Sequence, residues 1–292
     1  MKRGFILFSI LNVIFLFASC CHYSGKNRRC STENEQFLLD SSITVIGQPD
    51  TDYCDSLNEK KSSDSAYIIC NSAPLSYVSG QIIKKSSYIV CYNKDTKVPN
   101  WVSWHLTADH TDGPIRRMSN FYEEEGVVRP RATLEDYRGS GWSRGHMCPA
   151  GDNKWNETAM YDSFSLVNVC PQHASLNSGL WNVIERDCRK WAKKYKDLYI
   201  VCGPVYLNRE HETIGLNKVV VPEAFYKVIL RLTPEPAAIG FVVRNNEGKK
   251  KKDQFVNTVD DVERITGIDF FSALPDDIEN KVESQADIND WK

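Results

Sequence analysis

The most informative stretch of this chain is SGWSRGHMCPA, residues 140–150. Its first part, Trp142–Met147, has the composition of a strand. His146 is the side chain type best suited to proton transfer near neutral pH. Arg144 offers a planar fork for phosphate oxygens, and we expect Gly145 to leave room for a bulky anion. The stretch therefore indicates a site that handles a phosphate at the end of a strand.

Two further segments extend this site. A second strand-like run, Phe164–Cys170, carries Asn168, and an amphipathic helix is predicted from Leu176 to Tyr195. Asn177 opens that helix, and Glu185 follows after about 12 Å of rise and about 80° of rotation. A hard cation such as Mg²⁺ takes one or two protein oxygens and keeps several waters. We therefore expect Asn177 to bind an ion and Glu185 to reach its waters, an arrangement suited to phosphodiester hydrolysis.

Each of these residues also has an ordinary structural explanation. A lone histidine beside a glycine, such as His146, more often has a structural role than a catalytic one. Asn177 at a helix start is usually an N-cap, and Glu185 alone would be a solvated helix residue. Composition and periodicity do not decide between the two interpretations.

In combination, the residues resemble the signature of the DNA/RNA non-specific endonucleases. This family belongs to the ββα-metal (His-Me finger) nucleases and includes the mitochondrial endonuclease. The resemblance runs from about Ser86 to Leu274. It implies an α+β fold with a mixed or antiparallel central sheet flanked by helices. It also implies a metal-dependent endonuclease that uses Mg²⁺ or Mn²⁺ and hydrolyses both DNA and RNA.

The resemblance implies a role for each matching residue. His146 would be the general base and Asn177 the direct metal ligand. Glu185 would bind metal-coordinated water. Asn168 would position the catalytic loop or the histidine, and Arg144 would stabilise phosphate charge.

The family also uses an upstream arginine on the leaving-group side. Arg117, four residues before Phe121, is the best candidate here. Arg116 and Arg131 are rivals, because the loop that carries them aligns poorly with the family pattern.

One position departs from the family signature, which usually reads Asp-Arg-Gly-His. Ser143 stands where the aspartate is expected. Serine keeps a hydrogen-bonding group but removes a charge, so ion affinity and rate could both fall. Asp152 is a candidate to compensate. The alternative function is therefore a degenerate family member that binds nucleic acid or a partner with weak or no cleavage.

The overall charge limits how this chain can bind nucleic acid. A formal net charge of −2 provides no global basic field. A turnover enzyme needs only a local cationic groove, however. Contacts to the phosphate backbone carry no sequence information, so we expect broad substrate choice and binding that weakens in salt.

The N-terminus has the layout of an export signal over residues 1–20. Lys2 and Arg3 precede an apolar run, Phe5–Phe17, and Ala18-Ser19 then precede Cys20. The arrangement resembles a bacterial lipobox, which implies a lipid on Cys20 and a membrane-anchored protein at the cell envelope. Simple secretion to the periplasm or beyond, and an uncleaved anchor, are the alternatives.

Residues 21–66 are polar and are predicted to be an irregular tether, with a single nuclease domain over residues 67–292. Eight of the ten cysteines lie beyond Cys21, and an exported chain can oxidise them. Cys170 and Cys202, each in an apolar run, could equally be buried small hydrophobic residues. A thiol or zinc site at Cys148, Cys170 and His173 is a third interpretation, although a complete zinc set is missing.

Outside the site, the pattern predicts several regular elements. A helix capped by Thr258 is predicted near the C-terminus. Alternating or continuous apolar runs predict strands at Tyr67–Cys70, Tyr88–Tyr92, Trp101–Leu106, Leu198–Cys202, Lys218–Val221, Phe225–Leu232 and Ala238–Val243.

Overall fold

The computed structural model describes residues 75–76 and 79–292, of which 75–76 are described as backbone only. The predicted export signal, the polar tether and the strand at Tyr67–Cys70 lie outside these residues. All described residues belong to one compact unit. None of the helices in the described part of the chain combines the length and apolar character needed to cross a membrane.

The core of the fold is a seven-stranded sheet in which every neighbouring pair is antiparallel. The expected α+β class is confirmed, with the antiparallel form of the sheet. The strands predicted outside the site that fall on described residues are also confirmed. In spatial order the strands are β12 (Val256–Asn257), β11 (Ala237–Arg244), β10 (Ala224–Arg231), β7 (Asp197–Val205), β4 (Val98–Thr107), β3 (Ile89–Asn93) and β2 (Gln81–Lys84).

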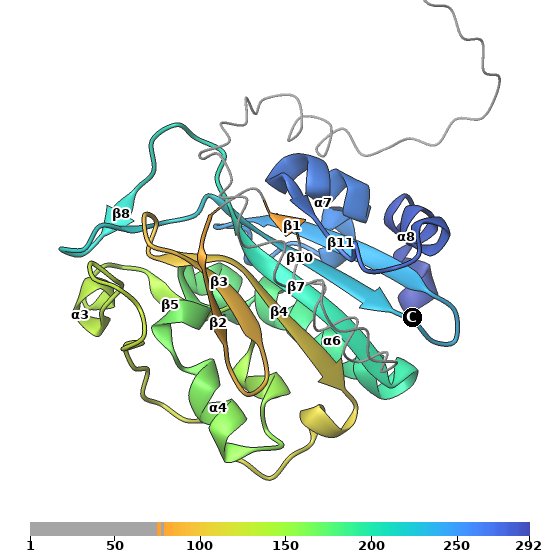
Figure 1. Ribbon diagram of the computed structural model, residues 1–292, viewed down its shortest axis with the longest axis horizontal. Coiled ribbons are helices and arrows are strands. Elements are labelled where there is room, and N and C mark those ends of the chain that lie inside the picture. The colour runs from red at the N-terminus through yellow and green to blue at the C-terminus, as the bar shows by residue number, and fades with distance from the viewer. Residues whose placement is uncertain (1–74, 77–78) are drawn as a thin grey trace, which may run out of the picture. The chain divides into compact units, whose positions relative to one another are not determined.

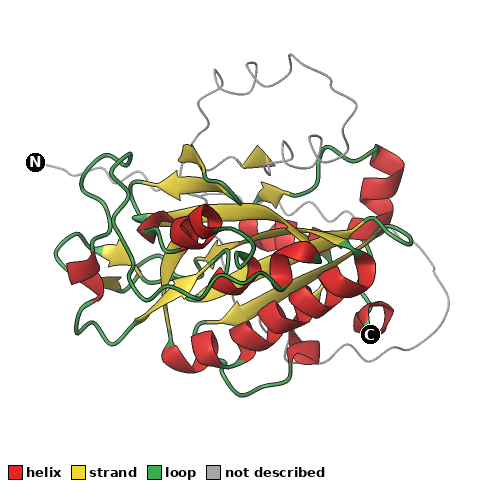
Figure 2. Cartoon of the chain, turned by 90° about the horizontal axis from the view of Figure 1, so that it is seen from below, coloured by secondary structure: helices red, strands yellow, loops and turns green. Residues whose placement is uncertain are grey.

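Both faces of this sheet are covered by helices, and successive side chains of β10 show which helix covers each face. Phe225 packs on Trp181 of the long helix α6 (Leu180–Tyr195), with ring centroids 5.7 Å apart. Tyr226, the next residue, points to the other face and packs on Phe270 at 5.4 Å. Phe270 follows α7 (Val259–Thr266), which packs against β10 and β11. We call the two sides the α6 face and the α7 face (Figures 1 and 2).

A separate two-stranded hairpin lies on the α6 face. It consists of β5 (Ser143–His146) and β6 (Val169–Gln172). Cys202 of β7 donates its thiol to the Met147 carbonyl at 3.2 Å, directly after β5. Cys202 pairs with Lys227, whose ammonium lies 4.7 Å from the Trp181 ring of α6. The hairpin and α6 therefore share one side of the sheet.

The other elements are short or peripheral. The helices are α3 (Leu134–Tyr137), α4 (Glu157–Ser163), α5 (Ala174–Ser178) and α8 (Asp276–Glu283), and the strands are β1 (Leu75–Ser76), β8 (Thr213–Ile214), β9 (Val219–Val220) and β13 (Ile268–Asp269). Single 3₁₀ turns cover Asp109–Thr111, Ala150–Asp152, Leu166–Asn168, Lys252–Phe255 and Ile288–Trp291. The predicted cap on α7 is confirmed, because the Thr258 side chain accepts from Asp261 N at 3.1 Å.

Two elements predicted near the site as continuous are each divided in the structure. The run Phe164–Cys170 is not one strand, because a 3₁₀ turn at Leu166–Asn168 precedes β6. The helix predicted from Leu176 to Tyr195 is two helices, α5 and α6, separated at Gly179. Gly179 has φ −99° and ψ −113°, which no helical residue adopts. Apolar residues recur every three or four positions on both sides of this break, so the sequence pattern does not reveal it.

The cysteines also differ from expectation. Cys30, Cys54 and Cys70 lie outside the described residues. The other five beyond the predicted signal are buried free thiols: Cys91, Cys148, Cys170, Cys188 and Cys202. The expectation of disulfides is wrong for these five, which pack as small hydrophobic residues.

Candidate active site

The hairpin fixes the backbone of His146. His146 pairs with Val169, and Met147 N donates to the Asn168 carbonyl at 2.9 Å just beyond the last pair. A Cβ at Gly145 would overlap the Gln172 side chain. The expectation that Gly145 makes room for an anion is therefore wrong: the glycine makes room for Gln172, a buried neighbour on the partner strand.

The imidazole of His146 lies between two aromatic rings. Its centroid is 5.0 Å from those of Phe121 and Phe164. The residue is 6% exposed, and its Nε2 has no hydrogen-bond partner among the described residues. A buried polar nitrogen without a partner is costly, and such groups recur at functional sites. This nitrogen is free to engage a water or a substrate oxygen.

Burial, together with the nearby charges of Arg117 and Arg144, lowers the pKa of His146 from its ordinary value of 6.5 to about 3. Desolvation disfavours the charged form of a base, and two neighbouring cations do the same. The ring is therefore neutral at physiological pH. A neutral imidazole can accept a proton, which an imidazolium cannot.

Asn168 connects the end of β5 to the turn before β6. Its Oδ1 accepts from Cys148 N at 2.8 Å, and its Nδ2 donates to the carbonyls of Cys148 at 2.8 Å and Ser163 at 2.9 Å. The side chain is fully buried. These bonds fix the backbone two residues after His146, so Asn168 holds the loop and does not reach the cavity described next.

A cavity of about 180 Å³ brings three of the predicted residues together. His146, Asn177 and Glu185 all line it. The remaining lining residues are Arg117, Pro149 and Asn182. Because β5, α5 and α6 each contribute a side chain, the cavity depends on the packing of the hairpin against both helices.

Asn177 comes from the short helix α5, and Glu185 comes from the second turn of α6. A Cβ at Gly179 would overlap the carbonyl oxygens of Ser175 and Gly248, so only glycine allows this close junction. The predicted distance along one continuous helix therefore does not apply. The bend at Gly179 instead lets both side chains line the same cavity.

The donors in this cavity fit a hard divalent cation. Asn177 and Glu185 offer an amide oxygen and a carboxylate, and neither side chain makes a hydrogen bond with any described residue. Oxygen donors of this kind suit Mg²⁺ or Mn²⁺, which complete their shell with waters and substrate oxygens. Burial raises the pKa of Glu185 to about 7, against the lowering effect of Lys227. A cation beside this carboxylate would favour its ionised form.

A second, larger cavity of about 520 Å³ adjoins the first and shares Arg117 with it. Arg138 and Arg144 line it as well, so it is a local cationic groove on a chain of net charge −2. The other lining residues are Phe121, Leu134, Tyr137, Trp142 and Ser143. Arginines combined with the half-buried rings of Phe121 and Trp142 suit a phosphate backbone with its bases.

The geometry separates the three candidate arginines. Arg117 lines both cavities, with its guanidinium carbon 5.3 Å from the Phe164 ring centroid. Arg131 points elsewhere, donating to the Glu125 and Val127 carbonyls. Arg116 is exposed and lines neither cavity. Of the three, Arg117 alone lies beside His146.

Ser143 lies in the larger cavity and not in the one that holds Asn177. The expectation that Asp152 compensates for the missing carboxylate is not supported. Asp152 is buried, and its two oxygens already accept from Arg189 at 2.8 Å and Trp104 at 3.1 Å. Its carboxylate therefore anchors α6 to the sheet and does not face the cavity.

The thiol or zinc interpretation is also not supported. His173 is exposed and hydrogen-bonds to Ser175, at the start of α5. Burial raises the pKa values of Cys148 and Cys170 well above the ordinary thiol value, so neither is a ready thiolate. Within residues 79–292, these three side chains do not come together as a ligand set.

Two residues at the site were missed by the sequence analysis as functional candidates. Asn182 lines the smaller cavity, three residues before Glu185 on the same face of α6, a spacing that could have indicated it. Lys227 is fully buried behind Glu185, with its ammonium 4.7 Å from the rings of both Trp104 and Trp181. The sequence pattern of β10 does not predict a role for this buried lysine, because its partners come from β4 and α6.

Comparison with known proteins identifies relatives. A sequence model of the DNA/RNA non-specific endonuclease family matches residues 68–277. The chain is 36% identical over 208 residues to mitochondrial nuclease EXOG from Xenopus laevis, covering 65% of this chain and 58% of that protein. It is 36% identical over 211 residues to nuclease C1 from Cunninghamella echinulata, covering 66% and 83%. The matches thus span less than two thirds of the EXOG relatives from frog, mouse and human.

The fold also resembles that of a protein with a crystal structure. A chain in the crystal structure of the EndoG/EndoGI complex matches with a TM-score of 0.66 at 28% identity. The match covers 74% of this chain and 95% of that chain. The antiparallel sheet and its helices are therefore shared with that structure.

Proposed function

This chain belongs to the DNA/RNA non-specific endonuclease family, and from that premise we propose that it is a metal-dependent endonuclease that hydrolyses the phosphodiester bonds of DNA and RNA. One observation carries the proposal. A neutral histidine with an unpartnered Nε2 shares a cavity with Asn177 and Glu185, the two oxygen donors predicted to hold the ion.

His146 is the general base. Its neutral ring accepts the proton of a water that attacks phosphorus, and Phe121 and Phe164 hold the ring in place. Asn168 acts as a positioning residue, because its bonds to Cys148 fix the backbone just beyond the histidine.

Asn177 holds the metal directly, and Glu185 holds it through water. Mg²⁺ or Mn²⁺ is the proposed ion, since both prefer hard oxygen donors. When bound, the ion stabilises negative charge on the phosphate and on the leaving oxygen. The lone amide ligand leaves the remaining coordination positions to water and substrate.

Arg117 and Arg144 neutralise the phosphate beside His146. Arg117 is proposed for the leaving-group side because it lines both cavities, and Arg144 for the incoming strand because it lines the larger one. Contacts of this kind read the backbone and not the bases, so cleavage is expected at many sequences.

The proposal is tested by nicking of supercoiled plasmid and by cleavage of single-stranded RNA. With Mg²⁺ the protein should cut both substrates, and EDTA should abolish cutting. His146→Ala should remove most of the activity. Cutting that is equally fast in EDTA would refute metal dependence, and an unimpaired His146→Ala would refute the role of the base.

Ser143 favours one alternative, a degenerate member that binds nucleic acid or a partner with weak or no cleavage. The motif aspartate is absent at this position, and no other carboxylate of the described chain lines the larger cavity. If the lost carboxylate is the defect, Ser143→Asp raises the rate sharply. Robust cleavage by the unaltered protein would rule this alternative out.

Export is a separate proposal that rests on residues 1–20 alone. We expect removal of the signal and a lipid on Cys20, which would anchor the nuclease at a bacterial cell envelope. Mass spectrometry of the protein from a bacterial membrane fraction should find a diacylglyceryl-modified N-terminal cysteine. Recovery of an intact Met1 would contradict the proposal.

A further inference from the structure

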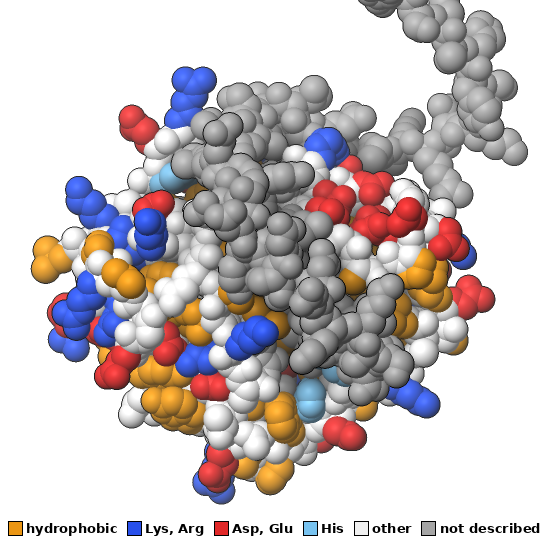
Figure 3. Space-filling view, viewed as in Figure 1, with side chains coloured by type: hydrophobic (Ala, Val, Ile, Leu, Met, Phe, Trp, Pro, Cys, Tyr) orange, Lys and Arg blue, Asp and Glu red, His pale blue; other side chains and the backbone are white. Residues whose placement is uncertain are grey.

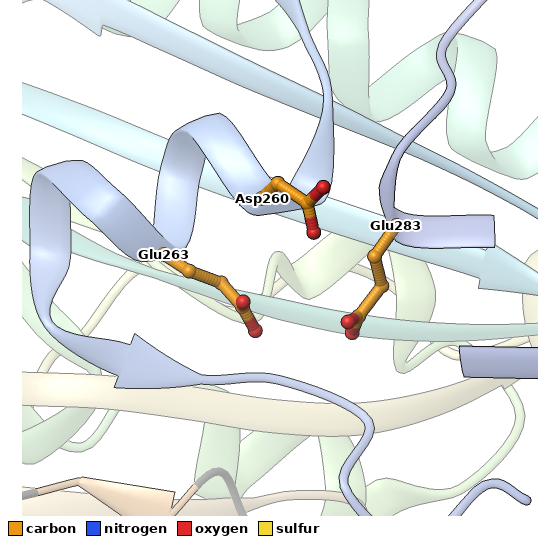
Figure 4. A group of neighbouring side chains, drawn as sticks. All are labelled: Asp260, Glu263 and Glu283. Atoms are coloured by element: carbon orange, nitrogen blue, oxygen red, sulfur yellow. The ribbon is translucent and has the colours of Figure 1, made fainter. Parts of the chain in front are cut away.

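Three carboxylates meet between α7 and α8, on the α7 face of the sheet. Asp260 and Glu263 lie one turn apart on α7, and Glu283 is the last residue of α8. One oxygen from each lies within 4.8 Å of the others. Figure 4 shows the three side chains converging on one space from the two helices.

The charge of this cluster is not compensated. Glu283 is 6% exposed, and its Oε1 has no hydrogen-bond partner among the described residues. Glu263 accepts one bond, from Phe270 N at 2.6 Å. In the described part of the chain, no lysine or arginine forms an ion pair with any of the three, and Arg264 pairs instead with Asp261. Buried carboxylates in proteins are normally paired or bound to a metal.

Neighbouring carboxylates make the electrostatic potential at this cluster more negative. Burial and the neighbouring carboxylates of Glu263 and Glu279 raise the pKa of Glu283 to about 9. Burial likewise raises the pKa of Glu263 to about 7. Acidic side chains gather on the surface over α7 and α8 (Figure 3). A cation between the two helices would favour the ionised forms of Glu263 and Glu283.

We propose that Asp260, Glu263 and Glu283 bind Ca²⁺ as a structural site separate from the active site. Ca²⁺ takes oxygen ligands at roughly 2.3–2.6 Å, so two of its ligands can be roughly 5 Å apart. The oxygens of this cluster, which lie within 4.8 Å of one another, match that spacing. Zinc is less suited, because the cluster has neither nitrogen nor sulfur donors.

This ion joins two elements that are distant from the proposed chemistry. It connects α7 to α8, while His146 and Asn177 lie on the α6 face. Ca²⁺ at this site therefore stabilises the folded chain by binding it in preference to the unfolded chain. It takes no part in phosphodiester hydrolysis.

The test measures Ca²⁺ binding and thermal unfolding in an Asn177→Ala background, which removes the proposed ligand of the catalytic ion. Calorimetry should detect one Ca²⁺ per chain with a Kd of roughly 10⁻⁴ M or tighter. Millimolar Ca²⁺ should raise Tm by several degrees. Glu283→Gln and Glu263→Gln should each weaken this binding at least tenfold and remove most of the Tm shift.

Asp277→Asn is the matched control, an exposed carboxylate on the same helix. It makes the same replacement of a carboxylate by an amide and should keep both the affinity, within twofold, and the Tm shift. Equal Ca²⁺ affinity in the parent and in Glu283→Gln would overturn the proposal. The comparison does not depend on the role given to Asn177, because every variant shares that background.

Discussion

At the scale of single residues, His146, the proposed base, and two arginines are grouped around the same two aromatic rings. Arg117 lies over Phe164 and Arg144 over Phe121, with guanidinium carbons 5.3 Å and 4.7 Å from the ring centroids. The same two rings contact His146. The two cations thus flank the histidine through its aromatic neighbours. They add to the effect of burial in lowering its pKa, and they place positive charge where a phosphate would enter.

Arg117→Ala should lower the cleavage rate roughly 10²-fold, because a group that stabilises charge in the transition state is lost. Arg116→Ala is the adjacent control and should remain within about twofold of the parent, since Arg116 lines neither cavity. Initial rates on plasmid at saturating Mg²⁺ measure both. Equal losses in the two variants would show that overall basicity matters and not the position of Arg117.

The residues of the site were predictable to different degrees. His146, Asn177 and Glu185 were identified from their type and family spacing, and the structure brings them to one cavity. Arg117 was the best candidate of three arginines, and Arg116 and Arg131 stayed as rivals because the position of Arg117 depends on Phe164, far along the chain. Lys227 could not be recognised either, because its two tryptophan partners come from other elements.

At the scale of elements, the junction between α5 and α6 determines the relative positions of the two proposed metal-binding groups. Asn177 precedes the break at Gly179, and Glu185 follows it. The amphipathic pattern predicted one continuous helix and missed the break, because Leu176 and Leu180 are buried as they would be in one helix. The information for the break lies in the contact of Gly179 with Gly248, a distant segment.

Gly179→Ala should therefore alter metal use more than folding. A Cβ there would push α5 away from Gly248 and displace Asn177. The Mg²⁺ concentration for half-maximal cleavage should rise at least about tenfold, consistent with the loss when a metal site is misaligned. Gly126→Ala is the control, because its Cβ would meet nothing nearer than 3.9 Å. An unchanged Mg²⁺ dependence in Gly179→Ala would contradict the role of the junction.

At the scale of the whole molecule, the chain combines a slightly negative net charge with a local groove lined by Arg117, Arg138 and Arg144. The acidic residues over α7 and α8 lie on the other face of the sheet. Net charge could be read directly from the sequence. The segregation of the charges could not, because it depends on which face each helix covers.

Salt dependence tests this separation. Arg138→Gln should weaken binding to different DNA sequences uniformly and reduce the slope of log affinity against log salt by about 1. Arg264→Gln is a close match, because both arginines are exposed and pair with a carboxylate three residues earlier. Its slope should equal that of the parent. Equal reductions in the two variants would contradict a local groove. Fluorescence anisotropy in Ca²⁺-free buffer with inactive His146→Ala protein gives the slopes.

Acid stability follows from the pKa of His146. Its folded value of about 3 lies below the ordinary 6.5, so the unfolded chain takes up the proton first as pH falls. The resulting stability is complete above pH 6.5 and is lost as pH falls towards 3. Between pH 7 and pH 5 the loss should be about 2 kcal/mol. Urea unfolding in EDTA should show this extra loss relative to His146→Phe, and parallel losses in the two proteins would contradict it.

The central claim, that His146 is the base of a metal-dependent nuclease, is tested most directly by single-turnover cleavage with His146→Ala in Mg²⁺, with and without added imidazole. The control is His105→Ala. Trp104 contacts Lys227 on the α6 face, and His105 is the next residue on β4, so its side chain points to the opposite face, away from the site. The account predicts a rate about 10²- to 10⁴-fold below the parent, partial recovery with imidazole and no change in the control. A His146→Ala rate equal to that of the parent would contradict it.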